Sequence, residues 1–477
     1  MNTVHRLPAR CYVPRMSSPA PTSNPFLVGH YEPVREESDA AALEVIGELP
    51  DSLVGTYMRN GANPAFDPIG RYHVFDGDGM IHAVSFDGGT ASYRNRYVVS
   101  RGLAAERRAG RALFGGLSEF HLPDPEVMAE AGFMKNTANT HVVSHAGRVL
   151  ALMEAGKPTE IDDRLVTIGE YDFDGALQGP MTAHPKFDPT TGDMLFFGYS
   201  PFPPYLRFHV ADAAGRLIRS VDIDLPSPVM MHDFVATERH VVFFDLPAVF
   251  DLEAMMSGAA GIRWQPDNGA RIGVLDRQHP DDGVRWIEVE PFWVFHFLNA
   301  HDDGDAIVVD GCRAERLNVA FGDDELDGPV TPSLHRWRID VAAGTVVDEP
   351  LDDRPADFPR IDDRFAGLPA RYGYVSHAGA WGSEVVDFDG VTKHDLVAGT
   401  SETHVYGPAV VSGEAVFAPD PCRTGEDAGW LLNFVTDRTD GSSSLVVLDA
   451  ASMTETARVL IPRRVPFGFH GNWFPAG

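Results

Sequence analysis

The sequence predicts an all-β fold of the propeller type. From Asn24 onward, short β-branched and aromatic segments alternate with Gly, Asp and Asn turns, which is the pattern of short antiparallel strands. A polar turn followed by an apolar strand recurs in five segments, each predicting a hairpin: 145–154, 190–199, 238–247, 301–312 and 410–419. The first three turns lie about 45 to 50 residues apart, which suits blades of about four strands. A pair of β-sandwiches is the alternative.

A leader and a small helical cap complete the predicted organisation. Residues 1–25 are rich in Pro, Ser and Arg and lack periodicity, so we expect a mobile leader before a single domain spanning 26–477. Apolar positions three to four residues apart predict helices within 104–117 and 125–133, and therefore a cap over one face at about 104–133. A doubly wound α/β sheet is disfavoured because strands do not alternate with long helices.

Composition narrows the possible partners. The chain has 477 residues, with 39 Lys and Arg against 69 Asp and Glu, for a net charge of −30. Nucleic acid is disfavoured as a partner because its phosphates require cationic side chains. An anionic membrane surface is disfavoured for the same reason, and anionic substrates gain no long-range attraction. A neutral, apolar or aromatic substrate remains compatible with this charge.

The cysteines and the hydropathy pattern indicate a soluble protein. Cys11, Cys312 and Cys422 are far apart and form no C-x-x-C pair, which predicts no disulfide framework or structural zinc site and favours a reducing compartment. The first residues contain no apolar run of a secretory signal, and no stretch is long and apolar enough to span a membrane. We therefore expect a cytoplasmic location.

Four of the 19 histidines occupy similar settings, each beside a predicted strand: His184, His232, His296 and His470. Their separations of 48, 64 and 174 residues correspond to one blade, one blade and three blades, so four imidazoles could converge on the axis. His470 suits a last strand that closes the ring. A surface or core role is the ordinary expectation for each histidine alone, since separate histidines obey no local spacing rule. The chain shows no phosphate-binding loop, dinucleotide fingerprint, nucleophile elbow or H-E-x-x-H motif.

The chain resembles the carotenoid cleavage oxygenases, a family of non-haem iron enzymes. The resemblance runs from residues 24–37 to 469–474. Its landmarks are RNGANP (59–64), YHVFDGDGMIHAV (72–84), KNTANTH (135–141), GEYDFDG (169–175), TAHPK (182–186), MHDF (231–234), FHFLNA (295–300), EDAGWLL (426–432) and the terminal FHG. It implies a seven-bladed β-propeller with a helical cap, in which His184, His232, His296 and His470 bind Fe(II). Four neutral imidazoles suit a divalent ion and leave open positions on an octahedral iron for O2.

The resemblance also implies roles for residues around the metal. Three carboxylates, Glu154, Asp357 and Glu414, occupy the positions that orient the histidines through their second ring nitrogens. Asp357 departs from the family, which has glutamate there, and would reach through a water or a backbone shift. Thr140 matches a threonine near the vacant iron position; a buried turn threonine is the ordinary alternative. Met153 replaces a tryptophan common in apocarotenoid oxygenases, so the pocket wall should differ.

The expected reaction is cleavage of a conjugated C=C bond by O2 into two carbonyl products. The resemblance favours a carotenoid or apocarotenoid; the alternative is a stilbene or phenylpropenoid, with Lys135 as the substrate-binding residue of that branch. Leu103 stands near the place of that branch's partner tyrosine. Aromatic residues beside the ligands could line an apolar tunnel, and about half of them, including Phe295 and Phe469, should do so while the rest are core. The six are Phe292, Trp293, Phe295, Phe297, Phe469 and Trp473.

Two further possibilities stay open at this point. A non-enzymatic propeller could use its cap face to bind a partner or to store an apocarotenoid, and it would not need the four histidines. Release of product into a membrane would require peripheral membrane contact, and no transmembrane span is expected. The sequence makes no prediction of oligomeric state.

Overall fold

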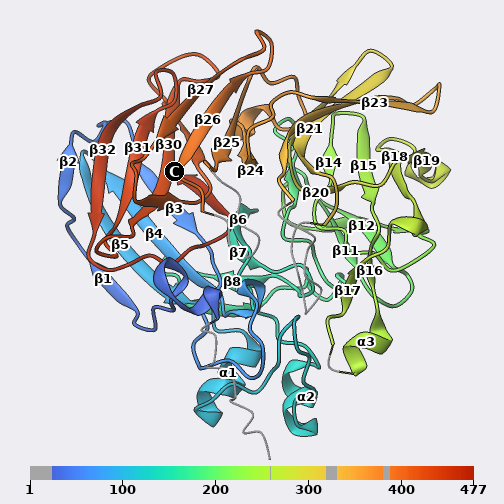
Figure 1. The fold of residues 1–477 in the computed structure, drawn as a ribbon, viewed down its shortest axis with the longest axis horizontal. Helices are drawn as coiled ribbons and strands as arrows, with labels where there is room; N and C mark the ends of the chain where they lie inside the picture. The colour runs from blue at the N-terminus through green and yellow to red at the C-terminus, as the bar shows by residue number, and fades with distance from the viewer. Residues whose placement is uncertain (1–23, 258, 318–329, 380–386, 477) are drawn as a thin grey trace, which may run out of the picture.

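Seven β-sheets surround a common axis in the computed structural model, which describes residues 24–257, 259–317, 330–379 and 387–476 (Figure 1). Each of these seven sheets contains at least four strands, with antiparallel pairing between neighbours. The predicted seven-bladed propeller is therefore confirmed, and a pair of sandwiches is excluded. Most of the predicted leader lies outside the described residues. Its last residue, Pro25, begins a 3₁₀-helix that is capped by the Asn24 side chain.

Five consecutive blades contain four strands each. They are β6 (His141–His145), β7 (Arg148–Leu152), β8 (Thr159–Ile161) and β9 (Thr167–Glu170); β10 (Lys186–Phe187), β11 (Met194–Tyr199), β12 (Leu206–Ala211) and β13 (Leu217–Ile223); β14 (Val235–Ala236), β15 (His240–Asp245), β18 (Ala270–Asp276) and β19 (Arg285–Val289); β20 (Trp293–Asp303), β21 (Ala306–Ala314), β22 (Ser333–Asp340) and β23 (Thr345–Pro350); and β24 (Ala356–Arg360), β25 (Tyr372–His377), β26 (Gly390–Asp395) and β27 (Thr400–Val405).

The two remaining blades combine strands from both ends of the chain. One contains β28 (Val410–Ser412), β29 (Val416–Pro419), β30 (Gly429–Asp437), β31 (Ser443–Asp449), β32 (Thr454–Ile461) and the N-terminal β2 (Val45–Gly47). The other contains the C-terminal β33 (Gly471–Pro475) with β3 (Gly55–Arg59), β4 (Met80–Asp87), β5 (Thr90–Tyr97) and β1 (Ser38–Ala40). The ring is thus closed twice by pairing between early and late strands, and His470 precedes the closing strand as predicted.

A cap of three helices covers one end of the propeller (Figure 1). The helices are α1 (Arg101–Ala109), α2 (Pro125–Ala131) and α3 (Leu252–Met256). The predicted helix at 104–117 is wrong in its extent, because Gly110 adopts the left-handed conformation that ends α1. Arg108 of α1 and Glu130 of α2 form an ion pair at 2.5 Å. The sequence did not predict α3, which is five residues long and follows β16 (Ala248–Phe250) in an insertion that returns through β17 (Ile262–Trp264).

Short 3₁₀ segments occupy several connections: η1 (Pro25–Leu27), η2 (Gly29–Tyr31), η3 (Val74–Asp76), η4 (Pro266–Asn268), η5 (Pro280–Asp282) and η6 (Asp363–Phe365). Within the described ranges, no helix is long and apolar enough to cross a membrane.

Four of the five predicted hairpins are confirmed, and the fifth is wrong. Strands β6–β7, β10–β11, β14–β15 and β20–β21 pair across the predicted turns. In the segment 410–419, β28 and β29 do not pair with each other but both pair with β30. From Ser412 to Val416 is four steps, against three from Val435 to Leu432 on β30, so one extra residue forms a bulge around Glu414.

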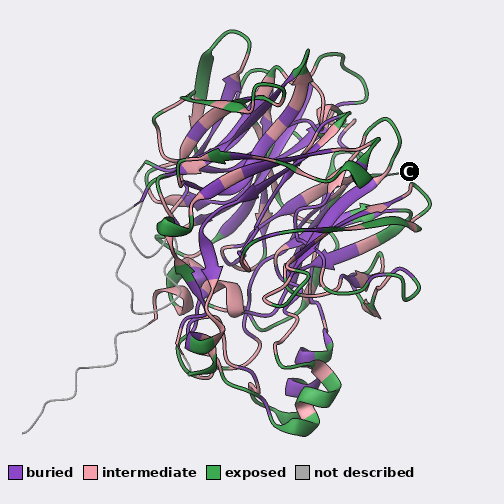
Figure 2. Cartoon of the chain, turned by 90° about the vertical axis from the view of Figure 1, so that its right-hand side faces the viewer, coloured by how far each residue is buried: buried purple, intermediate pink, exposed green. Residues whose placement is uncertain are grey.

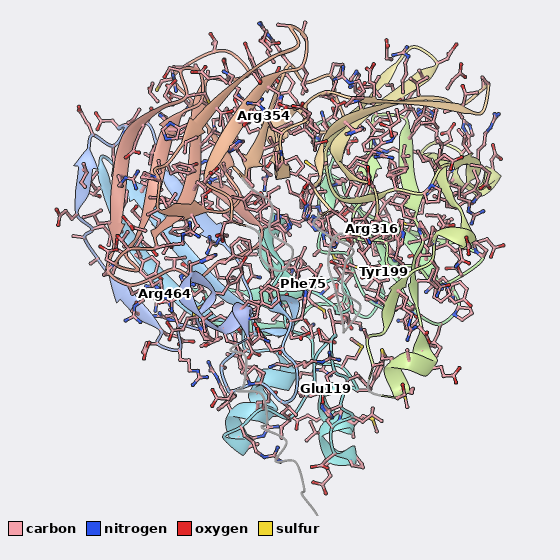
Figure 3. All side chains as sticks on the ribbon, in the orientation of Figure 1. Phe75, Glu119, Tyr199, Arg316, Arg354 and Arg464 are labelled. Carbon is pink, nitrogen blue, oxygen red and sulfur yellow. The ribbon has the colours of Figure 1, made fainter. Side chains whose placement is uncertain are left out.

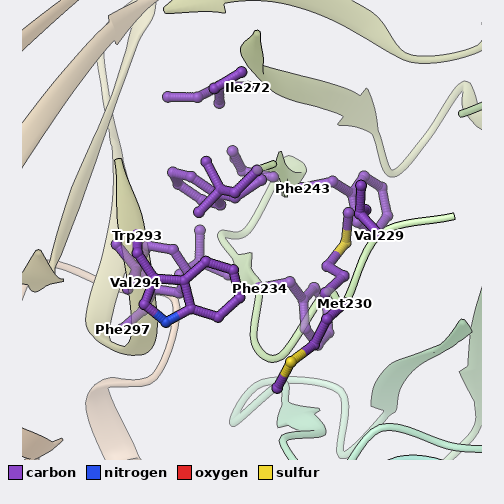
Figure 4. Close-up of a cluster of buried hydrophobic side chains, with 14 of the residues drawn as sticks. Val229, Met230, Phe234, Phe243, Ile272, Trp293, Val294 and Phe297 are labelled. Atoms are coloured by element: carbon purple, nitrogen blue, oxygen red, sulfur yellow. The ribbon is translucent and has the colours of Figure 1, made fainter. Parts of the chain in front are cut away.

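The core lies within and between the blades, whose strands are largely buried while the cap helices expose one side (Figure 2). The largest cluster joins the blades of β10–β13, β14–β19 and β20–β23. Figure 4 shows part of it, including Met230, Phe234 and Phe297, which flank two of the predicted histidine ligands. This dense packing fixes the inner strands and hence the positions of those histidines.

Candidate metal centre

The first strand of each blade lies at the axis. Neighbouring first strands contact one another: β20 contacts both β14 and β24, and β33 contacts both β29 and β6. His184 and His232 precede β10 and β14, His296 lies in β20, and His470 precedes β33. The blades that carry His184, His232 and His296 follow one another around the ring. His470 belongs to the blade three places after that of His296. The predicted blade steps are therefore confirmed.

Local irregularities in the ladders direct three of the axial side chains. The β20–β21 register shifts between Val294 and Phe297, and His296 lies in that bulge. The β24–β25 register shifts after Asp357, where Phe358 has a φ of 50°. Glu414 occupies the bulge between β28 and β29. A bulge re-aims a side chain that regular pairing would hold perpendicular to the sheet, and such bulges are common beside active sites.

The Nε2 atoms of the four predicted ligands converge. His184 Nε2 and His232 Nε2 are 3.0 Å apart, and His232 Nε2 and His296 Nε2 are 3.2 Å apart. One nitrogen from each of these three histidines and from His470 lies within 4.8 Å of the others, and all four side chains are buried. Two ligands at right angles on an ion about 2.1 Å from each would be about 3.0 Å apart. The residues present therefore fit a single divalent ion.

Three of the imidazoles contact carboxylates through Nδ1. His296 Nδ1–H donates to Asp357 Oδ1 at 2.8 Å, and His470 Nδ1–H donates to Glu414 Oε1 at 2.9 Å. The Glu154 carboxylate contacts Nδ1 of His232. This arrangement fixes the tautomer that leaves the Nε2 lone pair free for a metal. Asp357 reaches His296 directly, because the chain is irregular at the neighbouring Phe358, so no bridging water is needed.

Two residues that the sequence did not single out hold these carboxylates in place. The Tyr199 hydroxyl donates to Glu154, and burial followed by the Glu154 charge raises the pKa of Tyr199 well above its usual value. Arg360 Nη1 donates to Glu414 Oε2 at 3.2 Å and to the Gly471 carbonyl at 2.8 Å. Arg360 belongs to the ADFPRID segment and could have been noticed there. Tyr199 carries no local signal, because it ends an ordinary buried strand.

Burial sets the protonation of the cluster. Burial and the neighbouring histidines lower the pKa of His184 and of His470 well below the ordinary value. Burial also lowers the pKa of His296, but the Asp357 carboxylate more than offsets this, and the net shift is upward. At neutral pH, His184 and His470 are therefore neutral, as metal ligation requires.

A fifth histidine lies beside the cluster but does not join it. The ring centroid of His141 is 5.4 Å from that of His470. His141 Nδ1–H donates to the Ala183 carbonyl at 2.8 Å, and its Nε2 accepts from Asn472 Nδ2 at 3.0 Å. Burial is the main cause that lowers the pKa of His141 to about 3. With both nitrogens occupied, this imidazole braces β6 against β33.

A cavity of about 1050 Å³ lies between the cluster and the cap. His232, His296 and His470 form part of its wall, together with the predicted residues Thr140, Phe295 and Phe469. Figure 3 shows two other wall residues, Phe75 and Tyr199, near the middle of the molecule above the cap. Met153 also lines the cavity. Of the remaining predicted aromatics, Phe292, Trp293 and Phe297 are core, and Trp473 packs away from this cavity.

Lys135 lines the same cavity and is not a surface residue. Its Nζ lies 2.5 Å from both Asp78 Oδ1 and Glu106 Oε2, and all three side chains are almost completely buried. Burial would lower the pKa of Lys135, but the two carboxylates more than offset it and raise the pKa. The cluster of Lys135, Asp78 and Glu106 therefore carries a net charge of −1. Leu103 is buried in the core beside Met80 and Tyr97.

Comparisons with known proteins agree with this geometry. The family model described as retinal pigment epithelial membrane protein (RPE65) matches residues 31–475. A carotenoid cleavage oxygenase of Mycobacterium tuberculosis is 36% identical over 96% of this chain and 98% of that protein. An isoeugenol monooxygenase of Pseudomonas nitroreducens is 33% identical over 95% of this chain and 98% of that protein.

A solved structure supports the same assignment. The lignostilbene dioxygenase of Pseudomonas brassicacearum superimposes with a TM-score of 0.89 and 32% identity, over 96% of this chain and all of that one. These relatives are named as oxygenases, which supports an enzyme over a purely ligand-storing propeller. The chain belongs to the RPE65 family of carotenoid oxygenases and is an enzyme of the carotenoid-cleavage dioxygenase type.

Proposed function

We propose that the protein is an Fe(II)-dependent dioxygenase that cleaves a conjugated C=C bond of an apolar alkene with O2. The convergence of four buried imidazole nitrogens beside an apolar cavity carries this proposal. His184, His232, His296 and His470 would hold the ion. Four imidazoles without a ligating carboxylate suit a divalent transition metal and leave positions open. When bound, the iron would supply O2 binding and activation.

The protein's own residues would position the alkene and keep water out. Phe295 and Phe469 present apolar rings next to His232 and His470, so a polyene or aromatic alkene can pack beside the cluster. Thr140 is fixed from both sides, because its hydroxyl donates to Asn139 Oδ1 at 2.9 Å and its carbonyl accepts from His470 N at 3.1 Å. Its methyl group would shield one side of the cluster. Holding the scissile bond in one orientation lowers the entropic part of the barrier.

A carotenoid or apocarotenoid is the first substrate class. The Mycobacterium relative named a carotenoid cleavage oxygenase supports this choice, as does the size of the cavity, at the upper end for a ligand pocket. The charge of the cavity wall also favours this class. Lys135 is already neutralised by Asp78 and Glu106, so the wall offers an ionised phenol no net attraction.

Cleavage of a stilbene or phenylpropenoid alkene is the second candidate. Lys135 favours it, because an ammonium has three N–H donors and only two acceptors are found for it among the described residues. The third could donate to a neutral phenol hydroxyl. The isoeugenol and lignostilbene relatives support the same class.

Direct assay decides between these classes. Iron-reconstituted protein would be incubated under O2 with one apocarotenal, one carotenoid, one 4-hydroxystilbene and isoeugenol, and the products read by mass spectrometry. Two carbonyl fragments from the polyenes are expected. Full turnover by a metal-free preparation would contradict the iron proposal, whichever alkene is cleaved.

A compensated variant tests Lys135. Lys135→Met alone would leave two buried carboxylates without a counter-ion, at about 3–5 kcal/mol. Lys135→Met with Asp78→Asn and Glu106→Gln removes the charges together, and Lys135→Arg is the matched control. We expect apocarotenal cleavage to stay within about threefold of wild type, a barrier change below about 0.7 kcal/mol. A loss of tenfold or more on hydroxystilbene, with no wild-type activity on the apocarotenal, would instead favour the second class.

Peripheral contact with a lipid surface would deliver such a substrate. Leu122, Met128, Phe133, Phe202 and Met256 are exposed apolar side chains on or near the cap, with exposed fractions of 40–65%. Phe133 and Phe202 also line the cavity. Co-sedimentation with neutral phosphatidylcholine vesicles, compared between wild type and Phe202→Ser with Met256→Ser, measures this contact.

A further inference from the structure

A second cavity, of about 510 Å³, reaches the histidines from the side opposite the cap. Its wall is built from the residues that follow each ligand along the inner strands, such as Lys186 after His184 and Asp233 after His232. The apolar cavity is instead lined by residues that precede the ligands, such as Met230 and Phe295. The two cavities therefore lie on opposite sides of the histidine cluster. The second is called the axial channel below.

The histidines divide between the two spaces. His296 and His470 line both of them. His232 lines only the apolar cavity, and His184 lines only the axial channel. Of the two cavities, only the channel gives an ion direct access to His184.

Most charges of the axial channel are paired. Lys186 Nζ lies 2.7 Å from Asp233 Oδ1, and Arg277 Nη2 lies 2.6 Å from Asp188 Oδ2. Arg360 pairs with Glu414 next to His470. After this pairing two carboxylates are left, Glu238 and Asp363. The formal charges of the side chains in the channel wall therefore sum to −2.

Asp363 and Glu238 face open water at the channel. The Asp363 side chain is 71% exposed and only 3.4 Å from Arg360, a loose contact. Glu238 is exposed and forms no ion pair among the described residues.

Among the described residues, the apolar cavity offers a divalent cation no comparable carboxylate. Asp78 and Glu106 are bound to Lys135, Glu154 is bound to His232 and Tyr199, and Asp357 is bound to His296. Asp76 accepts hydrogen bonds from the backbone N–H groups of His73 and Leu117. A hydrated ion would have to shed water against aromatic rings there, which is costly. In the channel it can exchange water for carboxylate oxygen.

We propose that the axial channel is the route by which the divalent metal ion reaches the histidine cluster, with Asp363 and Glu238 attracting it at the channel wall. The proposal rests on the metal centre of the proposed function. The ion and the alkene would then use separate entry routes. The ion arrives from the side opposite the cap, and the alkene arrives from the cap side. The proposal also predicts that a bound alkene does not trap or exclude the metal.

Metal uptake can be measured without turnover. Metal-free protein would be mixed with Co²⁺ at low ionic strength, and the visible absorption of the bound ion followed in time. Asp363→Asn with Glu238→Gln should slow association at least about threefold, and the difference should shrink in high salt. Asp353→Asn, which removes an exposed charge outside the channel, is the matched control and should leave the rate unchanged.

Steric variants give an independent test. Ala366→Trp narrows the channel at its wall and should slow both Co²⁺ uptake and its removal by a chelator, so the equilibrium affinity stays the same. Thr190→Trp narrows it from the turn between β10 and β11 and serves if the first variant does not fold. Val397→Trp is the control for added bulk and should change neither rate, because Val397 lies on the exposed turn between β26 and β27.

A ligand that fills the apolar cavity provides a third test of the route. Saturating bibenzyl, the unreactive analogue of stilbene, should leave Co²⁺ uptake unchanged. If bibenzyl slows uptake while the channel variants do not, the ion uses the cap side and the proposal is overturned. If wild-type protein takes up no ion at all, the metal centre is wrong and the route falls with it.

Discussion

Histidine–carboxylate pairs occur both at the axis of the propeller and in its outer blades. At the axis, His296 and His470 bond Asp357 and Glu414 through Nδ1 at 2.8 and 2.9 Å. In the blades, the same Nδ1 contact at 2.7 to 2.8 Å joins His240 to Asp302, His335 to Asp348 and His377 to Asp389. The local chemistry of the two sets is the same.

The difference lies in what the other ring nitrogen meets. The axial imidazoles are buried, and their Nε2 atoms converge with those of neighbouring blades. The blade imidazoles are partly exposed, and none of the three has another histidine ring in contact within the described residues. A histidine–carboxylate pair is therefore placed to act as a metal ligand only where several first strands meet. Four sets of variants test this difference between the axis and the blades.

Removing an axial ligand should have the largest effect. His232→Ala deletes one of the converging nitrogens, and we expect iron content to fall from about one per chain to near zero. His240→Ala deletes a blade imidazole and should retain full iron content. Metal analysis after gel filtration measures both. Equal iron loss in the two variants would mean that position at the axis does not matter.

Removing an axial carboxylate should have the next largest effect. Glu154→Ala frees the Nδ1 of His232 to change tautomer or rotate, and iron affinity should fall about 10–100-fold. Asp389→Ala, which frees the blade residue His377, should not change it. Chelator competition gives the affinities. A silent Glu154→Ala would show that this carboxylate does not orient the ligand.

Lengthening an axial carboxylate should have a smaller effect. Asp357 already bonds His296 directly, so Asp357→Glu adds a methylene to a packed site, at about 1 kcal/mol. We expect iron affinity to fall about fivefold. Asp389→Glu is the blade control, where the partly exposed chain can adjust. Tighter iron binding by Asp357→Glu would mean that the wild-type contact is too long.

Removing a blade carboxylate should have the smallest effect, confined to stability. Burial would raise the pKa of Asp302, but hydrogen bonds from His240, Thr237 and the Arg239 N–H lower it to about 2. A lowered pKa stabilises the fold above about pH 4, and this contribution is lost as pH falls toward about 2. Asp302→Asn should therefore flatten the loss between these values by about 1 kcal/mol, after allowing for solvent screening. Acid unfolding followed by circular dichroism measures it, and iron content at neutral pH should not change.

Much of the fold followed from local pattern. The alternation of apolar strands with polar turns predicted four hairpins correctly, because a turn and its two flanking strands are neighbours in sequence. The hairpin prediction for 410–419 was wrong because β28 and β29 both pair with β30, with Glu414 in the bulge between them. This pairing depends on a strand further along the chain. The predicted helix at 104–117 was too long because Gly110 ends α1. The chain beyond it turns to line the cavity.

The candidate site divides in the same way. The histidines, Glu154, Asp357 and Glu414 could be named from motifs, since each lies in a short recognisable segment. Their convergence, the direct bond from Asp357 to His296, and the roles of Tyr199 and Arg360 depended on seven first strands meeting at one axis. Sequence by itself determined which side chains are available and what chemistry they carry. Only the tertiary structure decided which nitrogens face one another and which charges are neutralised, because contacts between blades join residues about 50 to several hundred positions apart.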